Sequence, residues 1–244
     1  MRRLAFHEVM GVLRIGDLHP GGAAATDFLL AGLARSSPRV VLEVGAGIGL
    51  TSARMSERGW RVVALEPNEV LRKLLQARLP VEVRPNGLEA LDEPDGAYDA
   101  VIGESVFYAM DLPRTFSKIH RLLRPGGLLA FVDMVWTGAA DASVVAAVHD
   151  ETARTFGIPM ASRTHLTWAD WSHTLVETGF VKVEERRLPA GGSRRRRRDR
   201  LRSGVAALRH PAALVQHLHY RRLGQAPRVP PDWLESWMSV WRRP

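Results

Sequence analysis

The chain has 244 residues, of which 45% are hydrophobic, enough to bury the core of one large α/β domain. It contains no cysteine, which excludes disulfides, thiolate metal sites and a cysteine nucleophile, and a cytoplasmic location is expected. The formal net charge is +8, no apolar run approaches the roughly 18 residues of a membrane span, and the basic start lacks the apolar stretch of a secretory signal.

Strands and helices are predicted in alternation over the first 136 residues. Apolar periodicity and glycine or proline punctuation indicate strands at 39–44, 61–66, 81–84, 97–103 and 128–136. Between them the same signals indicate helices at 22–34, 48–58, 68–78, with Asn68 as the N-cap, and 112–123. This order predicts βαβ units and a parallel sheet with right-handed crossovers.

Beyond residue 136 the alternation becomes less regular. Helices are predicted at 142–156, 167–178 and near 205–223, and strands at 180–188 and 236–243, of which the last is expected to be antiparallel.

We therefore expect a single domain, residues 1–244, with an α/β fold. Its core is predicted to be a doubly wound, mostly parallel seven-stranded sheet of the Rossmann-like type. Helical lid additions are expected from the N-terminal segment 1–22, a helical cap at 137–178 and an insertion at 190–235 before the last strand.

The basic charge is concentrated in that insertion. Residues 1–185 carry a net charge of −4 and residues 186–244 a net charge of +12, and much of this excess lies in the arginine-rich run 193–202. A solvated loop is the simpler interpretation of the run, and binding to nucleic acid or another anionic surface is the alternative.

A glycine turn follows the first predicted strand in the segment VLEVGAGIGL. Gly45, Gly47 and Gly49 let the chain turn sharply and let a ligand touch the backbone. A dinucleotide site favours G-x-G-x-x-G, whereas here the third glycine comes one residue early. Glu43 beside the turn repels a pyrophosphate but attracts an ammonium group, and Glu66, at the end of the second strand, is placed to accept ribose hydroxyls. S-adenosylmethionine, a phosphate-free cationic nucleoside, fits this pattern.

The sequence resembles the class I S-adenosylmethionine-dependent methyltransferases, and within them the small-molecule, type 11-like branch. The matching stretches are VLEVGAGIG, VVALEPN, LEALDEPDGAYDAVIGESVFY and IHRLLRPGGLLAF, which cover about residues 38–135 in the family's order. The resemblance implies that Gly87 and Leu88 flank the adenine and that Glu104 faces the methionine part or the substrate. The implied contacts to S-adenosylmethionine, or to the product S-adenosylhomocysteine, come from Glu43, Gly45, Ala46, Gly47, Glu66, Pro67, Gly87, Leu88 and Glu104.

The methyl acceptor is expected to be a small molecule. The lack of cysteine excludes cytosine C5 and arsenic methylation, and GESVFY departs from the [DNS]PP[YFW] pattern of amino-directed nucleic-acid enzymes. Asp133 is followed by Met134, where a magnesium site of the catechol type needs an amide ligand, so no metal is expected.

His149 and His165 are the candidate general bases, because histidine accepts a proton near neutral pH. His7, His19 and Tyr108 are weaker candidates. We predict transfer of a methyl group from S-adenosylmethionine to an O, N or C atom of a small molecule, as in secondary metabolism, by in-line displacement. The alternatives are an RNA or other nucleic-acid methyltransferase that grips through the arginine-rich run, and a cofactor-binding protein without methyltransferase activity on the same scaffold.

Overall fold

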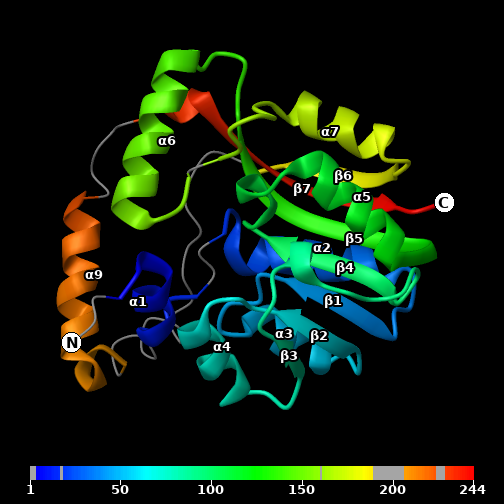
Figure 1. Ribbon diagram of the computed structural model, residues 1–244, viewed down its shortest axis with the longest axis horizontal. Helices are drawn as coiled ribbons and strands as arrows, with labels where there is room; N and C mark the ends of the chain where they lie inside the picture. The colour runs from blue at the N-terminus through cyan, green and yellow to red at the C-terminus, as the bar shows by residue number, and fades with distance from the viewer. Residues whose placement is uncertain (1–3, 17–18, 160, 189–205, 224–228) are drawn as a thin grey trace.

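A seven-stranded sheet with the order β3-β2-β1-β4-β5-β7-β6 forms the centre of the computed structural model (Figure 1). The structure describes residues 4–16, 19–159, 161–188, 206–223 and 229–244, so the arginine-rich run 193–202 lies outside the described residues. The strands are β1 (Val40–Val44), β2 (Arg61–Leu65), β3 (Glu82–Arg84), β4 (Tyr98–Glu104), β5 (Leu123–Trp136), β6 (Val181–Arg187) and β7 (Leu234–Arg242).

The sheet is mixed, and its one reversed strand is β7. The first five strands pair in parallel, whereas β7 runs antiparallel to both β5 and β6. The predicted antiparallel last strand is therefore confirmed, within an α/β sheet of the Rossmann-like type. Strand order reverses between β1 and β4, which makes the carboxyl ends of these two strands the expected place for a ligand.

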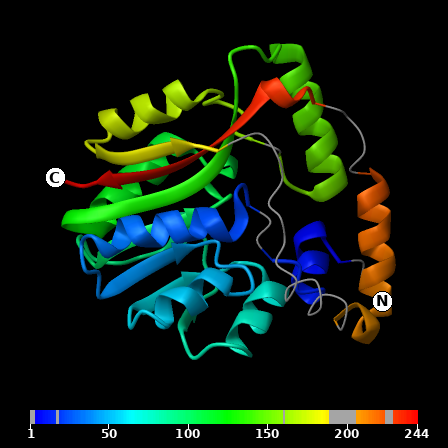
Figure 2. The same cartoon turned by 180° about the vertical axis from the view of Figure 1, so that it is seen from behind.

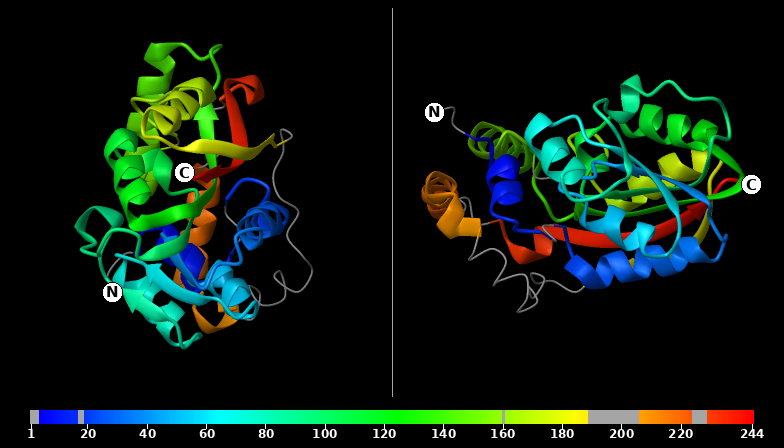
Figure 3. Two further views of the ribbon diagram at one scale, coloured as in Figure 1. Left: turned by 90° about the vertical axis from the view of Figure 1, so that its right-hand side faces the viewer. Right: turned by 90° about the horizontal axis from the view of Figure 1, so that it is seen from below.

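Helices cover both faces of the sheet (Figures 2 and 3). Successive residues of β1 are buried on opposite faces of the sheet. Val41 belongs to the core that one set of helices covers, and Leu42 belongs to the core that the other set covers. The first core is closed by α2 (Gly22–Ala34), α3 (Leu50–Ser56) and α4 (Glu69–Gln76), and the second by α5 (Leu112–Leu122) and α7 (Trp168–Glu177). Short 3₁₀ helices, η1 (Leu88–Ala90), η2 (Phe107–Ala109) and η3 (Pro231–Trp233), complete the connections.

Three further helices gather beyond the carboxyl ends of the parallel strands: α1 (Phe6–Val12), α6 (Ala142–Phe156) and α9 (Pro211–Leu223) (Figures 1 and 3). An aromatic cluster joins them, with ring centroids 5.0 Å apart for Phe6 and Phe156 and 5.4 Å apart for Phe6 and Tyr220. The Tyr220 hydroxyl also donates to the carbonyl oxygen of Leu4 at 3.2 Å. The N-terminal helix is thus attached to both later helices.

The predicted elements differ from the structure in a few places. Helices α2 and α6 have the predicted bounds, but β5 begins at Leu123 instead of residue 128, because Leu123 already pairs with Tyr98 across a bulge. The helix predicted near 205–223 is interrupted at His210: residues 206–209 are helical, and α9 begins anew at Pro211, since proline lacks the N–H that a helix interior needs and fits a first turn. Among the described residues, no helix is long and apolar enough to cross a membrane.

Candidate active site

Three carboxylates lie at the carboxyl ends of three neighbouring strands. Glu43 is the second-last residue of β1, Glu104 is the last residue of β4, and Glu66 directly follows β2. Burial raises the pKa of Glu43 to about 8, the hydrogen bond from Ser52 opposes this rise, and the negative charges of Glu104 and Glu66 add to it. The three acids therefore share one electrostatic environment at the edge where the strand order reverses.

Glu43 is the most enclosed of the three. Its carboxylate is buried and accepts a hydrogen bond from the hydroxyl of Ser52 in α3. Because its pKa lies above neutrality, Glu43 holds a proton at pH 7 until a positive charge comes near. A cationic ligand at this edge is thus able to draw Glu43 into its ionised form.

Glu66 holds the glycine turn in place. One carboxylate oxygen accepts from the backbone N–H of Gly47 at 2.7 Å, and the other from the N–H of Asn68 at 2.8 Å. Gly47 has φ = +57°, and no atom lies within 4 Å of the point where a side-chain Cβ would stand. The turn therefore presents bare backbone to open space beside Glu66, which suits a ligand that touches the main chain.

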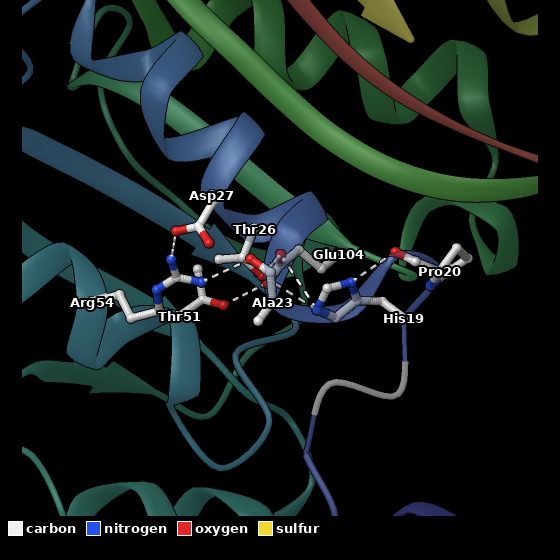
Figure 4. A network of polar contacts seen from close by, with 8 residues as sticks. All are labelled: His19, Pro20, Ala23, Thr26, Asp27, Thr51, Arg54 and Glu104. Carbon is white, nitrogen blue, oxygen red and sulfur yellow. Dashed lines mark hydrogen bonds and ion pairs between the residues drawn. The ribbon is translucent and has the colours of Figure 1, made fainter. Parts of the chain in front are cut away.

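Glu104 is the centre of a polar network drawn from three segments (Figure 4). It accepts from the hydroxyl of Thr26 in α2 at 2.7 Å and from that of Thr51 in α3 at 2.5 Å. The Nε2 atom of His19 lies 3.6 Å from the same carboxylate. Sequence reasoning missed the two threonines, because neither belongs to a spacing pattern and only the fold brings them to the end of β4.

Helix α1 packs against the glycine turn and against α4. A Cβ on Gly11 would clash with Leu71 and would lie 3.1 Å from Ile48, so α1 packs directly on α4 and on the turn. The side-chain amide of Asn68, the N-cap of α4, donates to Glu8 at 3.1 Å and lies 3.1 Å from the Nε2 atom of His7. The N-terminal segment thus lies over the end of β2, next to Glu66.

The remaining predicted cofactor residues lie along the same edge. Ala46 donates its N–H to the carbonyl of Leu65 at 3.0 Å, and the carbonyl of Pro67 accepts from Arg72. Beyond β3, Gly87 precedes η1, in which Leu88 is buried. All nine predicted residues therefore stand at the ends of β1 to β4, and their cofactor contacts remain predictions.

The two candidate bases lie apart from this edge. His149 is buried against Trp136, whose indole N–H donates to its Nε2 atom at 3.4 Å, and burial lowers the pKa of His149. His165 lines a cavity of about 500 Å³ between α5 and α7, together with Asp170 and His173. Neither histidine is brought next to the three carboxylates by the contacts of the described residues.

Of two other residues singled out in the sequence, Asp133 is buried in β5 and Tyr108 is partly buried beyond β4. Burial raises the pKa of Asp133 well above its usual range, and its carboxylate accepts from the backbone N–H of Phe107 at 3.2 Å. Burial, with the nearby charge of Asp133, raises the pKa of Tyr108 to about 12, so this phenol keeps its proton at neutral pH. In the described part of the chain, no three histidine, aspartate or glutamate side chains cluster as a metal site.

Known proteins are similar to the central part of this chain. Residues 42–131, which run from within β1 to within β5, match the family model described as a methyltransferase domain. An uncharacterized methyltransferase of Mycobacterium tuberculosis is 38% identical over 109 residues, which make up 44% of this chain and 43% of the relative. The chain thus spans less than half the length of that relative.

Solved structures show the same fold over nearly the whole chain. The cyclopropane synthase MmaA2 of Mycobacterium tuberculosis aligns with a TM-score of 0.70 at 17% identity, covering 99% of this chain and all of that one. The [4+2]-cyclase SpnF aligns with a TM-score of 0.67 at 16% identity, covering 98% of this chain and 93% of that one. Residues 42–131, which carry the glycine turn and the strand-end acids, are thus similar to a methyltransferase domain, and the chain shares the fold of these solved structures.

Proposed function

We propose that the protein transfers a methyl group from S-adenosylmethionine to an O, N or C atom of a small-molecule acceptor. The observation that carries the proposal is the group of three carboxylates, Glu43, Glu66 and Glu104, around a glycine turn that is open at Gly47. Such a group of acids repels a pyrophosphate and attracts a nucleoside with positive charges. When bound, S-adenosylmethionine supplies an electrophilic methyl group on a sulfonium centre.

The spacing of the strands supports one orientation of the bound ligand across the carboxyl ends of β2, β1 and β4. Neighbouring strands lie about 4.8 Å apart, so the ends of β2 and β4, two strands apart, are about 10 Å from each other. Glu66 at β2 is placed to accept the ribose hydroxyls, and the adenine then extends toward Leu88 beyond β3. The amino-acid part extends over β1 toward Glu104, which matches the length of the nucleoside.

The helices beyond the strand ends are proposed to form a lid. Helix α1 packs on the glycine turn, and the cluster of Phe6, Phe156 and Tyr220 attaches it to α6 and α9. Parts of the three predicted lid segments, 1–22, 137–178 and 190–235, thus contact one another above the edge that carries the acids. Closure there excludes water and aligns the acceptor with the methyl group, and alignment alone is worth several kcal/mol in such displacements.

Binding and product analysis test this function in two steps. Calorimetry on the purified protein should show binding of S-adenosylhomocysteine and no tight binding of NADH; the reverse result overturns the cofactor assignment. Cell extract incubated with the protein and a methyl-labelled donor is then separated into RNA and small molecules. Label in the small molecules supports the proposal, label in RNA overturns it in favour of a nucleic-acid enzyme, and label in neither overturns it in favour of a cofactor-binding protein without methyltransferase activity.

A further inference from the structure

Helix α9 is held to the rest of the protein by one of its sides. It stands at the margin of the molecule, with α1 between it and the sheet (Figures 1 and 2). Ala213 and Tyr220 are buried in a cluster with α1, and the side-chain oxygen of Gln216 accepts from the backbone N–H of Leu4 at 3.3 Å. These three positions of α9 are three and four residues apart, so they lie on one face of the helix. The opposite face is turned away from α1.

That opposite face leaves large apolar side chains in solvent. Val215 and Leu218, also three residues apart, are 67% and 47% exposed. Leu208, in the helical stretch 206–209 before α9, is 84% exposed. Leu208 and Val215 are the two most exposed large apolar side chains of the described residues. Single exposed apolar side chains are common, but three of them within 208–218 indicate an interaction surface.

The same part of the sequence is cationic. Residues 200–231 contain six arginines and no aspartate or glutamate. Arg209 directly follows Leu208 and is exposed. Apolar side chains next to cations, with no acid among them, are typical of a helix that lies in the surface of an anionic bilayer. The apolar side chains then enter the acyl boundary, and the cations stay at the phosphates.

Other occupants use only part of this surface. Nucleic acid pairs with arginines through its phosphates, but it gains little from leucine and valine. A second copy of the chain would place cation against cation, because this stretch of sequence has no acid to pair with them. An anionic lipid surface satisfies the charges and buries the apolar side chains at the same time.

We propose that this outer face, formed by Leu208, Val215 and Leu218 with Arg209 beside them, docks on an anionic lipid membrane. The inference goes beyond methyl transfer and does not depend on it. The aromatic cluster joins α9 to α1, and α1 packs on the glycine turn. A protein docked through α9 therefore holds the carboxyl ends of its parallel strands close to the lipid surface.

Co-sedimentation of the full chain with lipid vesicles tests the docking. Vesicles of phosphatidylglycerol and phosphatidylcholine should bind the wild type at least about tenfold more tightly than vesicles of phosphatidylcholine alone, because each arginine at an anionic surface contributes about fivefold in affinity. Leu208→Gln combined with Val215→Gln should weaken binding to the anionic vesicles about tenfold or more, since two apolar side chains no longer enter the lipid. Arg209→Gln should weaken it about fivefold, and Arg209→Lys, which keeps the cation, should bind as the wild type does.

The control is an apolar side chain of similar exposure elsewhere. Val176, in α7, is 60% exposed, and α7 lies away from α9 (Figure 1), so Val176→Gln should bind the anionic vesicles as the wild type does. The double variant replaces exposed side chains only and should keep the melting temperature of the wild type. Should it not fold, the two Arg209 variants decide, and equal binding by both overturns the proposal.

Three results contradict the docking outright. Undiminished binding of the double variant shows that the outer face does not touch the lipid. Binding to an RNA oligonucleotide but to neither kind of vesicle makes the segment a nucleic-acid site. A dimer in sedimentation velocity that the double variant loses, again without binding to vesicles, makes the outer face a contact between two copies of the chain.

Discussion

Glu43→Gln should make the ligand-free protein less sensitive to alkaline pH. In the folded protein the pKa of Glu43 is about 8, against 4.5 for an exposed glutamate. A folded-state pKa above the unfolded value means that the folded state holds the proton more tightly. The stabilisation from Glu43 is therefore complete below pH 4.5 and is lost as the pH rises through 8.

The size of the effect follows from the shift in pKa. At about 1.4 kcal/mol per unit, the full loss between low and high pH is about 5 kcal/mol. Roughly 2 kcal/mol of it falls between pH 6 and pH 8. Burial also raises the pKa of Glu66 and that of Asp133, but in both proteins alike. Glutamine keeps an oxygen that accepts the hydrogen bond from Ser52, so the substitution removes the titration and little else.

Urea unfolding at pH 6 and pH 8 measures this difference. The wild type should lose about 2 kcal/mol more unfolding free energy than Glu43→Gln over that interval, with equal m-values. The other buried acids titrate in both proteins, so they cancel in the comparison. If both proteins lose the same free energy, Glu43 does not titrate in this range and its raised pKa is refuted.

Three further substitutions test the site and its cover. Gly47→Val should abolish binding of S-adenosylhomocysteine in calorimetry, because its side chain fills the open space of the turn, and strain at positive φ should cost about 1–2 kcal/mol of stability. Glu66→Ala should weaken the same binding by about 1–3 kcal/mol, the scale for a lost partner of buried hydroxyls. Phe6→Ala should release α1, because it removes the ring contacts of Phe6. Amide hydrogens of residues 4–16 should then exchange about tenfold faster, which corresponds to ~1.4 kcal/mol of lost aromatic packing. Exchange of the amide hydrogens of β1 should not change.

Matched controls exist for these substitutions. Gly59 also has positive φ and open space around it, but lies in the connection between α3 and β2, so Gly59→Val should lose stability and retain binding. Loss of binding in both glycine variants would show that Gly47 acts through folding alone. Glu177→Ala, on the surface of α7, is the control for Glu66→Ala and should retain binding of S-adenosylhomocysteine. Faster exchange throughout the sheet in Phe6→Ala would contradict a local role for the aromatic cluster.

The sequence predicted the sheet and its acids because both depend on local patterns. Strands with apolar runs, a glycine turn and an acid at the ends of three strands remain recognisable without tertiary information. Helix α1 was not predicted, since seven residues make a marginal helix that persists here through packing on α4 and α9. The network of His19, Thr26 and Thr51 around Glu104 also escaped prediction, because its members come from separate segments and meet only in the folded chain.

The reversed strand β7 also determines the order in which the sheet is completed during synthesis. Strand β6 stands at the edge of the sheet, and its neighbour there is β7 and not β5. When residues 181–187 leave the ribosome, their partner has not yet been translated, and β5 still offers a bare edge. Only the arrival of residues 234–242 joins the two, so a nascent chain that stalls before that point carries an unfinished sheet that chaperones must protect from aggregation.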